Sequence, residues 1–234
     1  MSQKIRCKIA ELIDHGEGVY SLVLKPDTIA PRFLPGQFLH LAMDPYNPGD
    51  FWPESRVFSI ASPSKDRNSL RITYAVKGKF THRMESDLRC GSEVWIKLPY
   101  GEFTINTATD ACLLAGGTGI TAFTAFLSNI TGEYPHSIYL FYGARNADLL
   151  IYRSLVESAI EQCLKLHRYY LVEVGQVNGF LTGRINLNDV WNNVPHPQNV
   201  TFYLSGPPVM LKTISAELAE REIPAEQILM DAWE

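Results

Sequence analysis

Residues 113–121 have the sequence Leu-Leu-Ala-Gly-Gly-Thr-Gly-Ile-Thr. An apolar run that ends in a glycine-rich turn and leads into a helical stretch predicts a buried strand, a turn and a helix N-terminus. Glycines let backbone amides approach a ligand closely, and the positive end of the helix dipole favours an anion, so this turn could hold a pyrophosphate. The simpler alternative is a tight strand-to-helix connection without a ligand.

The same alternation of apolar runs and helical stretches continues through the second half of the chain. It predicts a doubly wound, parallel α/β sheet, because crossover helices bury both faces of such strands. Expected strands lie at residues 111–115, 137–142, 169–174 and 201–204, and expected helices at 120–129, 150–164 and 209–221.

The first half of the chain consists of short alternating segments separated by Gly, Pro, Asn and Asp. This pattern predicts an antiparallel β-barrel. Expected strands lie at residues 19–24, 37–42, 57–61, 70–76 and 93–98, and one helix, at 80–88, is expected to cap the barrel. A polar hinge at 104–109 separates the two patterns, so we expect one domain at residues 1–106 and a second at 107–234.

A second glycine turn follows the last long predicted strand. Residues 203–210 have the sequence Tyr-Leu-Ser-Gly-Pro-Pro-Val-Met, in which Pro208 suits the first turn of a helix. Alone, Gly-Pro-Pro is typical of an ordinary turn without a ligand. However, the carboxyl ends of parallel strands share one edge, where doubly wound sheets bind ligands. Two such turns at that edge could hold the two ends of a dinucleotide.

Two segments of the first half combine groups that suit a flavin nucleotide. Arg56-Val57-Phe58-Ser59 offers a cation for a phosphate, a ring to cover a flat heterocycle and a hydroxyl for a ring nitrogen. Residues 77–81, Lys-Gly-Lys-Phe-Thr, place a glycine turn at a helix start. Without further context, the first segment is an amphipathic strand and the second a capped helix.

Together these motifs resemble the ferredoxin-NADP reductase superfamily in order and spacing. They are Arg-x-Phe-Ser at 56–59, Gly-x-x-Thr at 78–81, Gly-Glu-Phe at 101–103, Gly-Gly-Thr-Gly-Ile-Thr at 116–121 and Gly-Pro-Pro-x-Met at 206–210. Pro-Gly-Gln-Phe at 35–38 and Tyr-Gly-Ala-Arg at 142–145 are similar to its oxygenase-reductase branch. The resemblance covers nearly the whole chain and implies a flavoprotein that transfers a hydride from NAD(P)H to FAD.

The resemblance also implies roles for individual residues. Arg56 would contact the FAD pyrophosphate, Phe58 would pack on the flavin and Ser59 would lie near flavin N5. The expected FAD-binding set is Arg56, Val57, Phe58, Ser59, Tyr74, Val76, Gly78, Lys79, Phe80, Thr81 and Trp233. The expected nicotinamide-dinucleotide set is Gly117, Thr118, Gly119, Gly206 and Pro207, and the expected catalytic set is Ser59, Ser205, Asp231 and Trp233. No separate acid–base catalyst is needed, because the hydride chemistry belongs to the cofactors.

Three positions affect the expected FAD affinity, hydride-transfer rate and cover of the flavin. Phe58 stands where many relatives carry Tyr, which keeps the ring but removes a hydrogen bond, so weaker FAD binding is expected. Ser205 stands where relatives commonly have Cys, so slower hydride transfer is expected. Trp233 is expected to cover the flavin face, as a terminal aromatic often does in this superfamily. The alternative for Trp233 is that it anchors a loose tail.

Coenzyme choice depends on the segment after the third predicted parallel strand. This segment contains Glu173, and a carboxylate suits a ribose hydroxyl but repels a 2′-phosphate, so NADH is favoured over NADPH. Arg145, Arg153 and Arg184 keep NADPH possible if one of them folds toward the adenosine ribose.

Bulk properties exclude several other classes of protein. The 234 residues carry a net charge of −4 with a pI near 5.9, which gives no electrostatic reason to expect nucleic acid. The four dispersed cysteines have no zinc or iron–sulfur spacing, so no metal site is expected. No apolar run approaches the roughly 20 residues that a membrane span needs. We therefore expect a cytoplasmic monomer.

The electron acceptor is not indicated by any motif. Because no ferredoxin-type cysteine run is present, we expect a separate redox acceptor protein, such as an iron–sulfur protein, an oxygenase component or a flavodoxin. Two alternatives stay open: a free-flavin or ferric-chelate reductase, and a non-catalytic regulatory subunit that keeps the fold. A basic group formed by Lys77, Lys79, His82 and Arg83 could dock an acidic partner or be an ordinary solvated helix start.

Overall fold

The structure, a computed structural model, describes residues 2–105 and 108–231. It divides into two compact units, Met1–Thr104 and Ile105–Glu234, here called the barrel unit and the α/β unit. Each unit is built on its own six-stranded sheet. The predicted fold class, an antiparallel β-barrel followed by a doubly wound parallel sheet, is confirmed.

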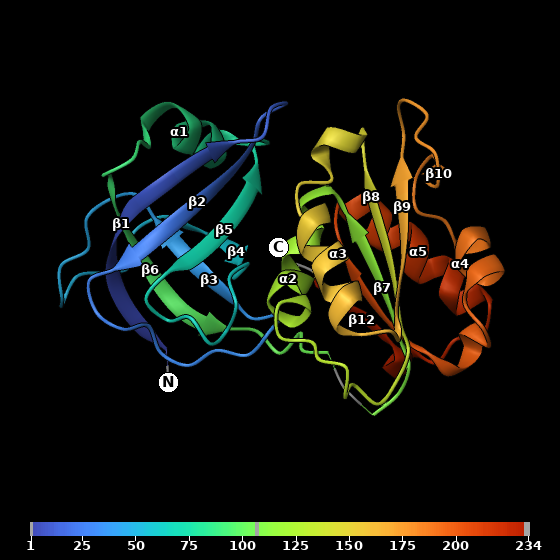
Figure 1. Ribbon diagram of the computed structural model, residues 1–234. Helices are drawn as coiled ribbons and strands as arrows, with labels where there is room; N and C mark the ends of the chain where they lie inside the picture. The colour runs from blue at the N-terminus through green and yellow to red at the C-terminus, as the bar shows by residue number, and fades with distance from the viewer. Residues whose placement is uncertain (1, 106–107, 232–234) are drawn as a thin grey trace. The chain divides into compact units, whose positions relative to one another are not determined.

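The sheet of the barrel unit is antiparallel and nearly closed (Figure 1). Its elements are β1 (Gln3–Asp14), β2 (Val19–Pro26), β3 (Phe38–Ala42), β4 (Ser55–Ser59), β5 (Leu70–Ala75), α1 (Lys79–Asp87) and β6 (Glu93–Tyr100). The strand order is β4-β3-β6-β1-β2-β5. Beyond β4, the N–H of Ala61 donates to the carbonyl of Arg71 on β5 at 2.8 Å, so the two edge strands approach each other.

Side chains that alternate along the strands fill the barrel. On β1, Ile5, Cys7 and Ile9 are buried while their neighbours are exposed, as expected for a strand with one solvent-exposed face. The predicted strands omit β1, although this alternation is visible in the sequence. Helix α1 covers the barrel core with the buried side chains of Phe80 and Met84, so the predicted cap is confirmed one residue nearer the N-terminus.

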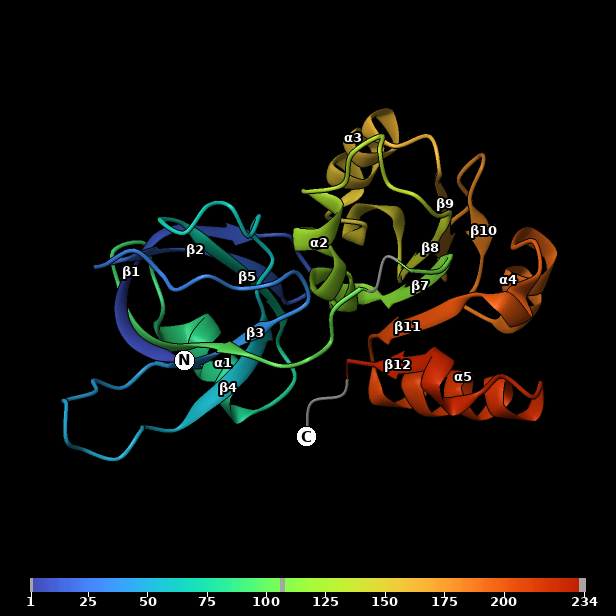
Figure 2. The ribbon, with the colours of Figure 1, turned by 90° about the horizontal axis from the view of Figure 1, so that it is seen from below.

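The sheet of the α/β unit is parallel throughout, in the order β10-β9-β8-β7-β11-β12. Its strands are β7 (Ala111–Gly116), β8 (Ile138–Ala144), β9 (Leu166–Val172), β10 (Leu181–Thr182), β11 (Thr201–Ser205) and β12 (Ile228–Met230), and its helices are α2 (Thr121–Leu127), α3 (Arg153–Gln162), α4 (Leu187–Asn193) and α5 (Pro208–Glu220). Helices α2 and α3 lie on one face of the sheet, and α4 and α5 on the other (Figure 2). This is the doubly wound arrangement.

Strand length explains which elements the sequence predicts. The central strands β7 and β8 are apolar and buried along almost their whole length. Their ends lie within two residues of the predicted ends. Strands β10 and β12 have two and three residues, too few for a periodic signal. Helix α4 was also missed, although Asn186 accepts a hydrogen bond from the N–H of Asp189 at 3.0 Å, a recognisable N-cap.

The helices of the structure are short. The longest, α5, has 13 residues. Within residues 2–105 and 108–231, no helix has both the length and the apolar character needed to cross a lipid bilayer.

We predict that the barrel depends on the packing of the α1 cap. Leu88, which ends α1, is 3% exposed and belongs to the barrel core, whereas Leu34 in the same unit is 60% exposed. Leu88→Ala should reduce the free energy of unfolding by about 2–5 kcal/mol through cavity formation. Leu34→Ala should change it by less than about 0.5 kcal/mol. Urea unfolding of both variants measures the difference, and equal effects would contradict the assigned packing.

Candidate functional site

Two glycine turns leave neighbouring strands at one edge of the α/β sheet. Strands β7 and β11 pair in parallel, with Ala115 opposite Ser205. The turn at residues 116–119 follows β7, and the turn at 206–207 follows β11. The sequence predicted two turns at corresponding edges, and the register now makes them direct neighbours.

The backbones of the two turns are in contact. A Cβ atom added to Gly119 would lie 2.3 Å from the carbonyl oxygen of Ser205, and one added to Gly206 would lie 3.1 Å from the Cα of Gly116. The Met210 side chain lies against both turns, because a Cβ on Gly116 would be 2.7 Å from its Sδ atom. Glycine is therefore required here for backbone-to-backbone packing.

One part of the first turn is open. Gly117 has φ +56°, a left-handed conformation that favours glycine, and an added Cβ there would meet nothing within 4 Å. The hydroxyl of Thr121 donates to the carbonyl of Thr118 at 2.8 Å, and this hydrogen bond holds the turn to the start of α2. An ordered glycine turn with free space above it fits a pyrophosphate.

A buried polar pair lies at the base of the second turn. The Ser205 hydroxyl donates to Oδ2 of Asp231 at 2.8 Å, and the two residues are only 3% and 5% exposed. The N–H of Asp231 donates to the carbonyl of Leu204 at 2.8 Å, which holds the chain after β12 against β11. Two residues of the predicted catalytic set are thus brought together from positions 26 apart in the sequence.

In the barrel unit, Arg56 lies beside the start of α1. Its guanidinium is 5.1 Å from the ring centroid of Phe80, a cation–π arrangement. The same group pairs with Glu54 at 2.9 Å, and about half of the Arg56 side chain is exposed. A half-exposed cation at a helix N-terminus suits a phosphate group.

The start of α1 is partly closed by its own threonine. Oγ1 of Thr81 accepts hydrogen bonds from the N–H groups of Lys77 (2.9 Å) and Gly78 (3.1 Å) and donates to the Gly78 carbonyl at 3.0 Å. The first-turn N–H groups of residues 79–81 have no partner within the helix. A Cβ on Gly78 would meet nothing within 4 Å, so the space over this terminus is open.

Aromatic rings connect β4 to β5. Phe58 is 9% exposed, and its ring lies 6.0 Å from that of Tyr74, which stacks on Tyr20 at 5.7 Å. Burial raises the pKa of Tyr74, and its hydroxyl has no hydrogen-bond partner among the described residues. Ser59 is buried at the end of β4, opposite Phe38. Val76 is half-buried just beyond β5 and donates its N–H to Gly18 at 2.8 Å.

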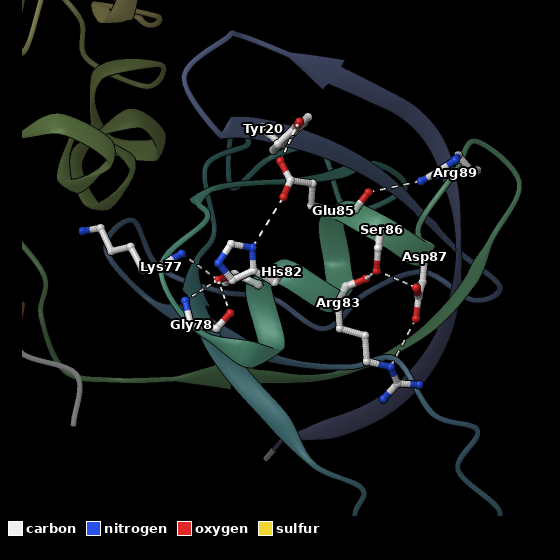
Figure 3. A network of polar contacts seen from close by, with 10 residues as sticks. Tyr20, Lys77, Gly78, His82, Arg83, Glu85, Ser86, Asp87 and Arg89 are labelled. Carbon is white, nitrogen blue, oxygen red and sulfur yellow. Dashed lines mark hydrogen bonds and ion pairs between the residues drawn. The ribbon is translucent and has the colours of Figure 1, made fainter.

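The exposed side of α1 carries a polar network (Figure 3). Arg83 forms ion pairs with Asp44 and Asp87, and His82 lies 3.6 Å from Glu85, which accepts a hydrogen bond from Tyr20 at 3.0 Å. In the part of the chain that the structure describes, Lys77 and Lys79 form no ion pair, and Figure 3 shows the Lys77 side chain directed away from the network. In the predicted basic group, Arg83 and His82 therefore lie beside acidic side chains, whereas Lys77 and Lys79 do not.

The segment after β9 carries a further charge pair. Nε of Arg184 lies 2.8 Å from Oε2 of Glu173, the carboxylate expected to select the coenzyme. Arg153 lies over the rings of Tyr170 (5.7 Å) and Phe180 (5.1 Å). Arg184 and Arg153, which could meet a 2′-phosphate, are thus both engaged by neighbouring side chains.

Several site residues were outside the predicted set. Met210 belongs to the Gly-Pro-Pro-x-Met motif, but the sequence did not predict a role for it. Its contact with both turns depends on the tertiary structure. The pairing of Arg184 with Glu173 had no sequence signal, because the two residues are 11 positions apart and follow different strands. Trp233, predicted to cover the flavin, lies outside the described residues.

Residues 113–216 match the family model of the oxidoreductase NAD-binding domain, so both glycine turns lie within the match. The chain is 25% identical to the propane 2-monooxygenase reductase component of Mycolicibacterium smegmatis, over 99% of this chain and 68% of the relative. It is 28% identical to the anthranilate 1,2-dioxygenase electron transfer component of Acinetobacter baylyi, over 82% of this chain and 55% of the relative. The chain thus spans between half and about two thirds of these relatives.

Solved structures with the same fold cover nearly the whole chain. The FAD/NAD-binding domain of nitric oxide dioxygenase from Vibrio cholerae has a TM-score of 0.82 at 19% identity, over 98% of each chain. The Amycolatopsis cytochrome P450 reductase GcoB has a TM-score of 0.84 at 18% identity, over 98% of this chain and 69% of that one. Residues 113–216 therefore carry an oxidoreductase NAD-binding domain, in a chain that has the fold of these FAD/NAD-binding reductases.

We predict that the two glycine turns cannot be separated without loss of both stability and nucleotide binding. Gly119→Ala would place a methyl group against the Ser205 carbonyl, which should cost about 2 kcal/mol or more of folding free energy and weaken NAD(P)H binding. Gly78→Ala, where the space is open, is the control and should cost about 1 kcal/mol or less, because only the N-cap preference of α1 is lost. Urea unfolding and nucleotide titration test this, and a fully stable Gly119→Ala variant would refute the packing.

Proposed function

We propose that this protein is a flavoprotein reductase that transfers a hydride from NAD(P)H to FAD and passes the electrons to a separate acceptor. The observation that carries the proposal is the pair of contacting glycine turns with open space above Gly117. Bound FAD would accept the hydride and release its electrons. In this proposal residues 1–106 form the FAD-binding domain and residues 107–234 the NAD(P)-binding domain.

The barrel unit would hold FAD through charge, backbone and ring contacts. Arg56 and the first-turn N–H groups of α1, at Lys79, Phe80 and Thr81, would bind the pyrophosphate, with Gly78 leaving room for it. The flavin contacts would come from Val57, Phe58, Ser59, Tyr74 and Val76. Phe58 cannot donate the hydrogen bond that a tyrosine would supply, so weak FAD retention is part of the proposal.

The α/β unit would hold and orient the dinucleotide. Gly117, Thr118 and Gly119 would meet its pyrophosphate and ribose, and Gly206 and Pro207 would lie near the nicotinamide. The buried Ser205–Asp231 hydrogen bond fixes the Ser205 side chain at the end of β11. We propose that Ser205 and Asp231 position the nicotinamide for hydride transfer, as Ser59 does for the flavin edge and Trp233 for its face.

NADH is the favoured donor in this proposal. Glu173 follows β9 directly and carries a negative charge that suits ribose hydroxyls and disfavours a 2′-phosphate. A cytoplasmic location is also proposed, because Cys7, Cys90, Cys112 and Cys163 are all free thiols, as a reducing compartment allows.

A separate redox protein is the proposed acceptor. The relatives reported above are named as the reductase component of a monooxygenase and the electron transfer component of a dioxygenase. By analogy, an iron–sulfur protein, an oxygenase component or a flavodoxin would take the electrons from this chain. A free-flavin or ferric-chelate reductase is the second candidate, favoured by the missing hydroxyl at Phe58.

The deciding experiment is a flavin titration followed by reduction. FAD should bind the purified protein, and NADH should bleach its absorbance at about 450 nm. Gly78→Val should weaken FAD binding by about tenfold or more, because the side chain fills the proposed pyrophosphate space. The FAD-free protein should stay folded and lose about 1 kcal/mol of stability, through the poorer N-cap of α1. Gly78→Ala should have an intermediate effect.

Each outcome separates one class of protein from the others. Saturable FAD binding, with bleaching of the bound flavin by NADH, supports the electron-transfer reductase. Turnover that saturates with added free flavin, without retained FAD, supports the flavin or ferric-chelate reductase. Protein that binds no FAD and does not oxidise NADH would refute both and leave the non-catalytic subunit.

We predict that the unpaired lysines near α1 help to dock an acidic acceptor. Lys79→Glu should slow electron transfer to the acceptor by about tenfold at low salt, with the deficit shrinking as ionic strength rises. Lys25→Glu makes the same charge change at an exposed position on β2 and is the control. Stopped-flow rates with candidate ferredoxins and flavodoxins measure both, and equal rates for the two variants would remove the docking role.

A further inference from the structure

The pair formed by Glu173 and Arg184 lies at the carboxyl end of β9. Glu173 follows this strand directly, and its N–H donates to the Ala144 carbonyl at the end of β8 at 3.2 Å. Arg184 follows β10, where the N–H of Gly183 donates to the Val172 carbonyl at 2.7 Å. Both backbones are therefore anchored to the sheet, and the 2.8 Å contact between Nε and Oε2 joins two fixed points.

This pair contributes little to stability. The Arg184 side chain is 81% exposed and the Glu173 side chain 38% exposed, and ion pairs in water stabilise a fold only slightly. Its effect is local, because the pair cancels two opposite charges at the sheet edge where the adenosine ribose is expected. Within the described residues, Glu173 is the acidic group that Arg184 contacts.

The geometry leaves one side of each group available. Nε of Arg184 is used by Oε2, while Oε1 of Glu173 remains able to accept from ribose hydroxyls. The guanidinium, by contrast, lies beside the carboxylate, whose negative charge lowers its net attraction for a 2′-phosphate. Arg184 is the arginine that contacts the selecting carboxylate, whereas the Arg153 guanidinium lies over the rings of Tyr170 and Phe180.

We propose that Arg184 is a masked 2′-phosphate ligand, and that its ion pair with Glu173 sets the preference of this protein for NADH. Glu173 acts twice in this arrangement: it accepts from the ribose and it holds the guanidinium away from a phosphate. Removal of the carboxylate charge frees a fork of N–H donors that matches phosphate geometry. This inference rests on the proposed function for its kinetic consequence but not for its binding consequence.

The first test measures binding without any redox step. Calorimetry with 5′-AMP and 2′,5′-ADP compares the ribose with and without a 2′-phosphate. Glu173→Gln should tighten 2′,5′-ADP by about tenfold relative to 5′-AMP, and the double variant with Arg184→Ala should lose this gain. Glu161→Gln, an exposed charge removal on α3, is the control and should show no gain.

The second test measures selectivity in turnover. Glu173→Gln should raise kcat/KM for NADPH relative to NADH by about tenfold, and the control Glu161→Gln should leave this ratio unchanged. If the NADPH gain persists in the double variant, it comes from removing repulsion alone and the role of Arg184 is refuted. No gain in Glu173→Gln also refutes it.

The two tests distinguish failure of this inference from failure of the proposed function. If the wild-type protein fails to reduce FAD with NADH, the proposed function falls, while the calorimetric comparison still decides the role of Arg184. If the wild-type protein reduces FAD but no variant gains 2′-phosphate binding, only the masking is wrong.

Discussion

The parallel pairing of β7 with β11 is the constraint on which the candidate site depends. This pairing sets Ala115 opposite Ser205, so the two strands end at the same level. The turns that follow are then forced into contact, with room for a Cβ at neither Gly119 nor Gly206. Because the backbone ladder pairs residues 111–115 with residues 201–205 one to one, the register fixes where the two turns lie relative to each other.

In the barrel unit, a helix start and side-chain contacts position the residues of the candidate site. There the open helix terminus is set by Gly78 and closed on one side by Thr81, while the Phe80 ring holds Arg56 beside it. The aromatic contacts of Phe58 and Tyr74 are part of the barrel core. The same residues therefore stabilise the barrel and form the proposed flavin surface, which ties flavin affinity to the packing of β4 and β5.

Charge is used differently at the two ends of the proposed dinucleotide site. Ser205 and Asp231 are buried together, where low polarity strengthens their hydrogen bond and fixes the Ser205 rotamer. Glu173 and Arg184 are exposed, where their attraction is screened and easily replaced by that of a ligand. A buried pair suits positioning, and an exposed pair suits selection between ligands.

The sequence by itself determined the fold class, the two glycine turns and the order of the motifs, because period-two and buried-strand patterns and glycine placement are local signals. It missed β10, β12 and α4, whose signals are short, and β1, whose alternation of Ile5, Cys7 and Ile9 was available. Only the tertiary structure decided that the turns touch, that Met210 lies against both, that Thr81 uses two of the N–H groups at the helix start, and that Glu173 holds Arg184. These contacts depend on strand register and loop return, which join residues far apart in the chain and leave no periodic trace in it.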